Sequence, residues 1–149
     1  MRLKILNTIL ALSILTIGTV ATASAQLPGT RTSAQIPFDF IVGEQKLPAG
    51  LYELRRIGND PYVLCIQNVD DRRDVAIFFT TRVDEVNLIR QSALVFHRYG
   101  DVYFLAQITS RYEGIARELQ PSEQERRMER GLTSNNKAPE SQSVPLAAN

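Results

Sequence analysis

Histidine, cysteine and tryptophan are scarce in this chain of 149 residues, which has one histidine, one cysteine and no tryptophan. The single cysteine, Cys65, cannot form a disulfide within the chain, so the fold must be stabilised by packing. One histidine (His97) and one cysteine are too few for a typical zinc site. We therefore expect no metal centre, and no motif indicates a cofactor.

The chain also lacks an excess of charge of either sign. It has 17 Lys and Arg residues against 16 Asp and Glu residues, a formal net charge of +1. A nucleic-acid-binding domain is expected to carry a clear basic excess. We therefore expect no nucleic-acid partner.

Long apolar runs are absent except at the N-terminus. Arg2 and Lys4 precede an apolar stretch over 5–20, and Ala23 and Ala25 then supply the small residues that a signal peptidase recognises. This order is typical of a secretory signal peptide, and the apolar stretch is shorter than the roughly 20 residues of a spanning helix. We predict a signal peptide over 1–25 and a periplasmic or secreted bacterial protein that spans no membrane after cleavage.

Alternating apolar and polar residues dominate the remaining chain and predict strands rather than helices. After a flexible leader over 26–34, the pattern predicts a single domain over 35–131. The runs 62–67 and 74–80 are nearly continuously apolar, which favours strands covered on both faces. We expect an all-β or mainly β fold, a small barrel or sandwich of about six to seven antiparallel strands.

One hairpin allows its register to be predicted. If Gly100 and Asp101 form a two-residue turn, His97 lies opposite Phe104 and the flanking strands cover 92–99 and 102–109. Leu94, Phe96 and Leu105 then share one face, and Val95, Phe104, Ala106 and Ile108 share the other.

The C-terminal part has a different character. Ser122 and Glu125 have the spacing of a capping box, which predicts a short surface helix over about 122–130. The residues 132–149 are polar and contain two prolines, so we expect a disordered tail.

Two stretches resemble an uncharacterised group of exported bacterial β-domains of the acidobacterial type. The first is Phe40-x-Val42-Gly43 followed by Leu47-Pro48-Ala49-Gly50-x-Tyr52, and the second runs from Leu94 to Asp101 with the sequence LVFHRYGD. The likeness covers roughly 35–130. It implies a single exported domain and carries over no catalytic residue.

Candidate sites are few. His97 has the chemistry of a general base, but its place in an apolar strand favours a structural role. A thiol–imidazole pair with Cys65 is disfavoured by the apolar neighbours of Cys65. The polar stretch 68–74 is loosely spaced like a calcium loop but lacks the glycine and distal glutamate of an EF-hand.

The leading hypothesis is a non-enzymatic envelope or secreted module that binds a protein partner, such as an envelope protein. The expected surface includes Arg98, Tyr99 and Asp101, with the segment 81–91 and the helix. Two alternatives stay open: a small exported hydrolase that uses His97, and a carrier of a small ligand inside a barrel.

Overall fold

The computed structural model describes residues 32–83, 91–133 and 137–148. These residues form an eleven-stranded sheet and one α-helix, so the predicted all-β fold with a short helix is confirmed. The predicted signal peptide and most of the segment 81–91 lie outside the described residues. The elements are β1 (Thr32–Ile36), β2 (Phe40–Val42), β3 (Gln45–Leu47), β4 (Gly50–Arg56), β5 (Val63–Asn68), β6 (Val75–Val83), β7 (Ala93–Tyr99), β8 (Val102–Ser110), β9 (Ile115–Leu119), α2 (Glu123–Thr133), β10 (Glu140–Pro145) and β11 (Ala147–Ala148).

There are more strands than the six or seven expected, partly because one expected strand is divided in two. Apolar residues alternate over 35–42 as in one continuous strand, but β1 ends at Ile36 and β2 begins at Phe40. Pro37 lies between them and has no backbone N–H to donate to a ladder. The inward faces still follow the alternation, since Ile36, Phe40 and Val42 are all buried.

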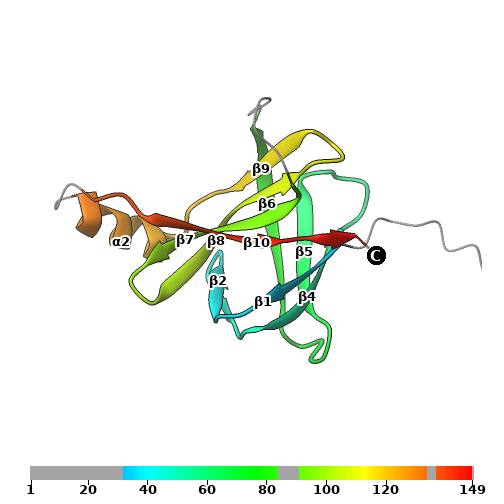
Figure 1. Cartoon of the computed structure of the whole chain (residues 1–149), viewed down its shortest axis with the longest axis horizontal. Helices are drawn as coiled ribbons and strands as arrows, with labels where there is room; N and C mark the ends of the chain where they lie inside the picture. Colours follow the sequence, from blue (N-terminus) through cyan, green and yellow to red (C-terminus); the bar gives the residue numbers. More distant parts are fainter. Residues whose placement is uncertain (1–31, 84–90, 134–136, 149) are drawn as a thin grey trace, which may run out of the picture.

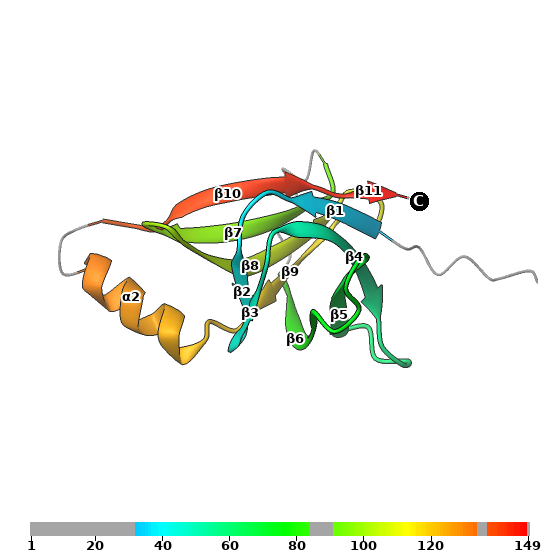
Figure 2. The ribbon, with the colours of Figure 1, turned by 90° about the horizontal axis from the view of Figure 1, so that it is seen from below.

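The sheet closes into a barrel because two elements, β6 and the C-terminal segment, each pair with two different strands. The order of strands is β10-β7-β8-β9-β6-β5-β4-β1-β11. The first half of β6 pairs with β5 and its second half with β9. The C-terminal segment pairs with β7 through β10 and with β1 through β11, so it joins the two ends of the order (Figures 1 and 2).

The prediction of a disordered tail is therefore wrong for residues 140–148. Val144 is buried in the main core, and Leu146 packs against it. The polar composition of this segment misled the prediction, because β10 contributes mainly backbone hydrogen bonds and exposed side chains. The expected leader is also too long by three residues, since β1 begins at Thr32 and Ala34 is buried.

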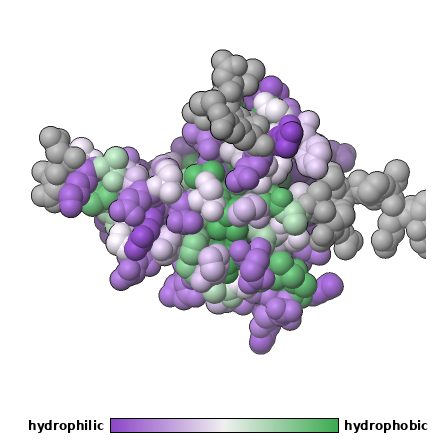
Figure 3. All heavy atoms as spheres, viewed as in Figure 1, coloured by the Kyte–Doolittle hydropathy of each residue, from purple (hydrophilic) through white to green (hydrophobic). Residues whose placement is uncertain are grey.

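The barrel interior is filled by side chains that alternate inward along the strands. Phe40, Tyr52 and Phe96 lie at its centre, with the Phe40 ring 5.1 Å from that of Tyr52 and 5.5 Å from that of Phe96. The edge-to-face arrangement of these rings is favourable beyond the area they bury. Polar side chains predominate along the outline of the face in Figure 3, and hydrophobic ones gather toward its centre.

The predicted register of the β7–β8 hairpin is confirmed near the turn, where His97 pairs with Phe104 and Phe96 with Leu105. The register then shifts between Val95 and Phe96. The extra residue on β8 is Ala106, and a bulge of this kind reverses the faces beyond it. Ile108 therefore joins Leu94 in the main core, not the opposite face to which the simple alternation assigned it.

A second, smaller core lies between the outside of the barrel and α2. It contains Ile41, Tyr99 and Phe104, against which Met128 and Leu132 of the helix pack. The helix runs three residues further than predicted, and Ser122 caps it by accepting a hydrogen bond from the Glu125 N–H at 3.1 Å. It is thus a cover over one face of the β7–β8 hairpin, which its low apolar content did not indicate.

The motif around Gly50 has a structural explanation. The Tyr52 hydroxyl donates to the Pro48 carbonyl at 2.7 Å, and Asp39 accepts from the Ala49 N–H at 3.1 Å. Gly50 does not have a positive φ, but a Cβ there would lie 2.8 Å from Nδ2 of Asn68. Glycine is therefore needed at position 50 for space.

We predict that Gly50→Ala lowers the free energy of unfolding by about 1–3 kcal/mol, as expected for overpacking in a filled interior. Asn68 cannot move away freely, because its Oδ1 accepts from the Asp70 and Asp71 N–H groups. Urea denaturation measures the effect. The matched control is Gly131→Ala, where a Cβ meets nothing within 4 Å and the helix favours alanine. Equal stability of the two variants would contradict the crowding argument.

We predict that Val144→Asp destabilises the protein by more than about 3 kcal/mol, because it places a carboxylate in the core at the closure of the barrel. The control is Ser143→Asp, one residue earlier on the exposed face of β10. Thermal melting followed by circular dichroism separates the two. A Val144→Asp variant that melts like the control would mean that the C-terminal segment does not close the barrel in solution.

Candidate functional site

His97 lies on the outer face of β7, where it meets the first turn of α2. Its Nδ1 is 2.9 Å from Oε1 of Glu125. The Tyr99 hydroxyl donates to the same carboxylate oxygen over a longer distance of 3.5 Å. Two alternate residues of one strand therefore hold one carboxylate of the helix.

The carboxylate at the centre of this cluster is deeply buried. The side chain of Glu125 is 5% exposed, while that of His97 is 37% exposed. A capping box would turn Glu125 back toward the start of its own helix, but the side chain points to the sheet instead. A buried carboxylate is stable only when it is paired and hydrogen-bonded. His97 and Tyr99 meet that requirement.

Both partners of Glu125 have shifted pKa values. The hydrogen bond to Glu125 is the main cause that raises the pKa of His97, opposed by burial and helped by the charges of Glu125, Glu129 and Glu118. Burial, followed by the charge of Glu125, raises the pKa of Tyr99 to about 12. Tyr99 is therefore a neutral hydrogen-bond donor at any physiological pH.

This geometry supports the structural role that the sequence favoured for His97. Among the described residues, Glu125 is the side chain to which the structure gives His97 a hydrogen bond. The cluster fastens α2 to the barrel.

Cys65 lies far from His97 in the sheet. Three strands, β8, β9 and β6, lie between β7 and β5 in the order of the sheet, so the two side chains are not on neighbouring strands. The Cys65 side chain is also buried. The thiol–imidazole pair, which the sequence disfavoured, is therefore not formed.

The expected interaction residues of the hairpin do not form one exposed surface. Tyr99 is buried under α2, so that part of the prediction is wrong. Arg98 donates to the Gly100 carbonyl at 2.8 Å and lies over the Tyr103 ring, 5.6 Å from its centre. Asp101 is exposed in the turn.

The polar stretch after β5 is organised as a turn. Asn68 accepts hydrogen bonds from two backbone N–H groups, and Asp71 is paired with Arg73 at 2.9 Å. In the parts of the chain that the structure describes, no group of three or more His, Cys, Asp or Glu residues is placed to hold a metal ion.

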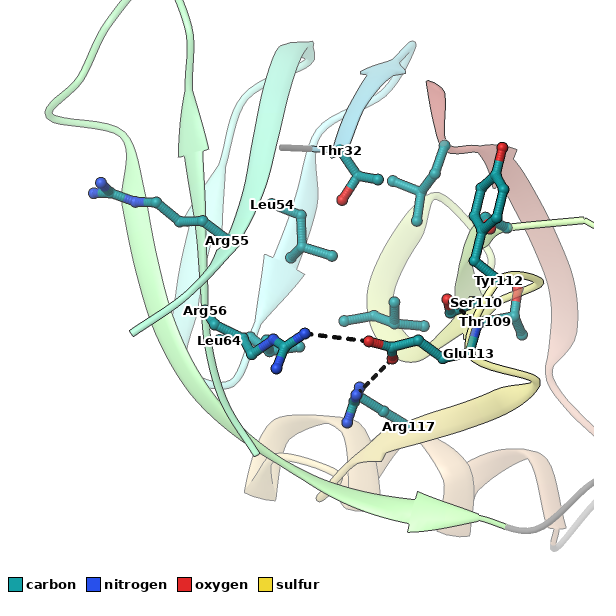
Figure 4. A pocket seen from close by; sticks show the side chains of 13 residues that line it. Thr32, Leu54, Arg55, Arg56, Leu64, Thr109, Ser110, Tyr112, Glu113 and Arg117 are labelled. Atoms are coloured by element: carbon teal, nitrogen blue, oxygen red, sulfur yellow. Dashed lines mark hydrogen bonds and ion pairs between the residues drawn. The ribbon is translucent and has the colours of Figure 1, made fainter. Parts of the chain in front are cut away.

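The sequence reasoning missed a cavity at one end of the barrel, which we call the barrel-end cavity (Figure 4). Strands β1, β5 and β7 begin at this end, and β4 and β8 end there. Glu113 pairs with Arg56 at 3.2 Å and with Arg117 at 2.7 Å across the cavity. The sequence did contain a signal of this cavity, because alternation places both arginines on inward faces. Arg56 shares a face of β4 with Tyr52 and Leu54, and Arg117 shares a face of β9 with Ile115 and Leu119.

A second feature is an apolar area on the outer face of β5 and β6, which we call the β5–β6 face. The run 74–80 was expected to be covered on both sides, but Ile77 is 62% exposed and Phe79 is 72% exposed. That prediction is wrong for β6, because no layer among the described residues packs on this side. Tyr62, just before β5, is 42% exposed.

Comparisons with known protein families, with curated proteins and with solved structures find no match for this chain. Within residues 32–83, 91–133 and 137–148, no helix has the length and apolar character needed to cross a membrane.

We predict that the contribution of His97 to stability depends on pH. Because the pKa of His97 is higher in the folded state, the contribution is fully present below the unfolded value of about 6.5 and is lost as the pH rises through the folded value. Urea denaturation between pH 5 and 9 should show that wild type is more stable than His97→Gln at low pH. The difference between their free energies of unfolding should become smaller as the pH is raised.

The neighbouring variant Arg98→Gln provides the control, since it changes the next residue of β7 and leaves the pair of His97 and Glu125 in place. Its difference from wild type should stay constant between pH 5 and 9. A gap for His97→Gln that is equally constant would show that the imidazole does not pair with Glu125 as a cation.

Proposed function

We propose that this protein is an exported, non-enzymatic bacterial module that binds a protein partner through the β5–β6 face. The observation that carries this proposal is the exposure of Phe79 and Ile77, two large apolar side chains on neighbouring outward positions of one strand. Contiguous exposed apolar side chains on a soluble domain are typical of interaction sites.

The β5–β6 face is built by strict alternation. Ala76, Phe78 and Thr80 of β6 point into the barrel and are buried, which leaves Ile77 and Phe79 outside. Phe79 pairs across the ladder with Val63, and Ile77 pairs with Cys65. The apolar area therefore spans two adjacent strands. The β5 strand is paired with β4 and with β6, whereas the part of β6 that carries Ile77 and Phe79 is paired with β5, and its ladder with β9 begins at Thr80. A partner would contact the outward side chains of this face.

The surroundings of this face are polar. Arg55 of β4 lies beside Cys65 in the ladder, and its guanidinium donates to Gln67 at 3.2 Å. On the other side, Thr81 pairs with the exposed Glu118 of β9. An apolar centre with aromatic side chains and a polar rim is the usual composition of a protein–protein interface.

The exported location rests on the N-terminal pattern of basic, apolar and small residues. An exposed apolar face of this kind suits a partner in the same compartment, such as an envelope protein. The expected chain after cleavage begins at Gln26, which N-terminal sequencing of the protein recovered from the periplasm or the medium can establish.

We predict that Phe79→Ser removes most of the partner captured by crosslinking of the tagged protein in its native host. Central aromatic residues of interfaces typically contribute 2 kcal/mol or more, which corresponds to a loss of about thirtyfold. Quantitative mass spectrometry of the crosslinked material measures it. Because Phe79 is exposed, the melting temperature should remain close to that of wild type.

The matched control is Val69→Ser, which removes an apolar side chain of 40% exposure in the turn after β5. It should leave capture unchanged. Equal capture by the Phe79→Ser and Val69→Ser variants would overturn the assignment of the β5–β6 face, and recovery of the protein alone would count against a stable partner.

A further inference from the structure

The barrel-end cavity combines an apolar floor with a charged rim. Leu54, Leu64 and Ile108 line it and belong to the main hydrophobic core. Arg56 at the end of β4 and Arg117 in the middle of β9 reach the cavity from inward-facing positions, and Figure 4 shows both turned toward Glu113. Most inward-facing positions of a small barrel are filled by apolar side chains, so two arginines at one end need an explanation.

The charges of this rim are not balanced. Two guanidinium groups share the single carboxylate of Glu113. The side chain of Arg117 is only 10% exposed, and besides Glu113 it donates to the neutral carbonyl of Pro61 at 3.3 Å. A cation that is partly removed from water and incompletely neutralised favours a second anion nearby.

The size of the cavity limits the ligand. Its volume is about 130 Å³. An engineered apolar cavity of about 150 Å³ in another protein binds benzene, so one ring fits here. A larger hollow of about 480 Å³ adjoins it and shares Thr32, Ser92, Tyr112 and Leu146 with its lining. The apolar floor therefore has a route to solvent.

We propose that the barrel-end cavity binds a small aromatic carboxylate, with the ring on the floor of Leu54, Leu64 and Ile108 and the carboxylate on Arg56. A planar guanidinium matches a carboxylate in geometry and can donate two parallel hydrogen bonds. Of the two arginines, Arg56 is the accessible one, because its side chain is 53% exposed. The added carboxylate balances the charge of the rim.

The test is titration of the purified, isotope-labelled protein with phenylacetate, followed by NMR of the backbone amides. We expect saturable shifts concentrated on residues that line the cavity, such as Thr109, Ser110 and Glu113, with a Kd of about 1 mM or tighter for a ligand of this size. Phenylacetamide has the same shape without the charge and should bind at least about tenfold more weakly.

The chain offers a matched pair of variants. Arg56→Gln should weaken phenylacetate binding at least about tenfold, since it removes a charge-assisted hydrogen bond. Arg55→Gln is the control, because the Arg55 side chain points away from the cavity in Figure 4 and donates to Gln67 on the outer face. The comparison of the two ligands on the wild-type protein does not depend on the folding of either variant.

Three results would overturn the proposal. The first is the absence of saturable shifts up to about ten times the expected Kd. The second is equal affinity for phenylacetate and phenylacetamide, which would show that the charged rim plays no part. The third is an equal loss of affinity in Arg56→Gln and Arg55→Gln, which would place the anion elsewhere.

Discussion

The closure of the sheet by its last strands is the constraint on which the rest of this structure depends. Without β10 and β11, β7 and β1 would each be an edge strand with unpaired backbone groups, which attract other chains and do not stay buried. With them, β7 and β1 each have a paired strand on both sides, and the strands enclose the main hydrophobic core. Leu146 marks the change of partner, and its N–H donates to the Ser92 carbonyl at 2.9 Å.

The helix α2 has a fixed place on the outside of the barrel. The outer face of the β7–β8 hairpin carries Tyr99 and Phe104, which would be exposed if α2 did not cover them. Met128 and Leu132 alone give a small apolar contact between the helix and the barrel. The buried carboxylate of Glu125 adds directional hydrogen bonds with His97 and Tyr99. An ionic contact in a low-dielectric setting costs much when it is broken, so it specifies one docked position.

Two parts of the barrel depart from the rule of apolar side chains inside and polar side chains outside. The arginines of the barrel-end cavity are charged groups at inward positions, and the β5–β6 face has apolar groups at outward positions. Departures from local consistency are expected where a protein is shaped for function as well as for stability. The two lie on different sides of the same wall, since Arg55 and Arg56 are neighbours that point to opposite faces of β4.

The sequence by itself determined the class of fold, the turn at Gly100 and Asp101 with its local register, and the cap of α2 at Ser122. These features depend on residues close together in the chain, through alternation, turn chemistry and capping. Only the tertiary structure decided that 140–148 close the barrel, that a bulge at Ala106 turns Ile108 inward, and that Glu125 meets His97 and not its own helix end. The three share one physical reason. Each is set by pairing between strands, or packing between layers, that are distant in sequence. The composition or periodicity of one segment does not specify which backbone or side chain will lie opposite it.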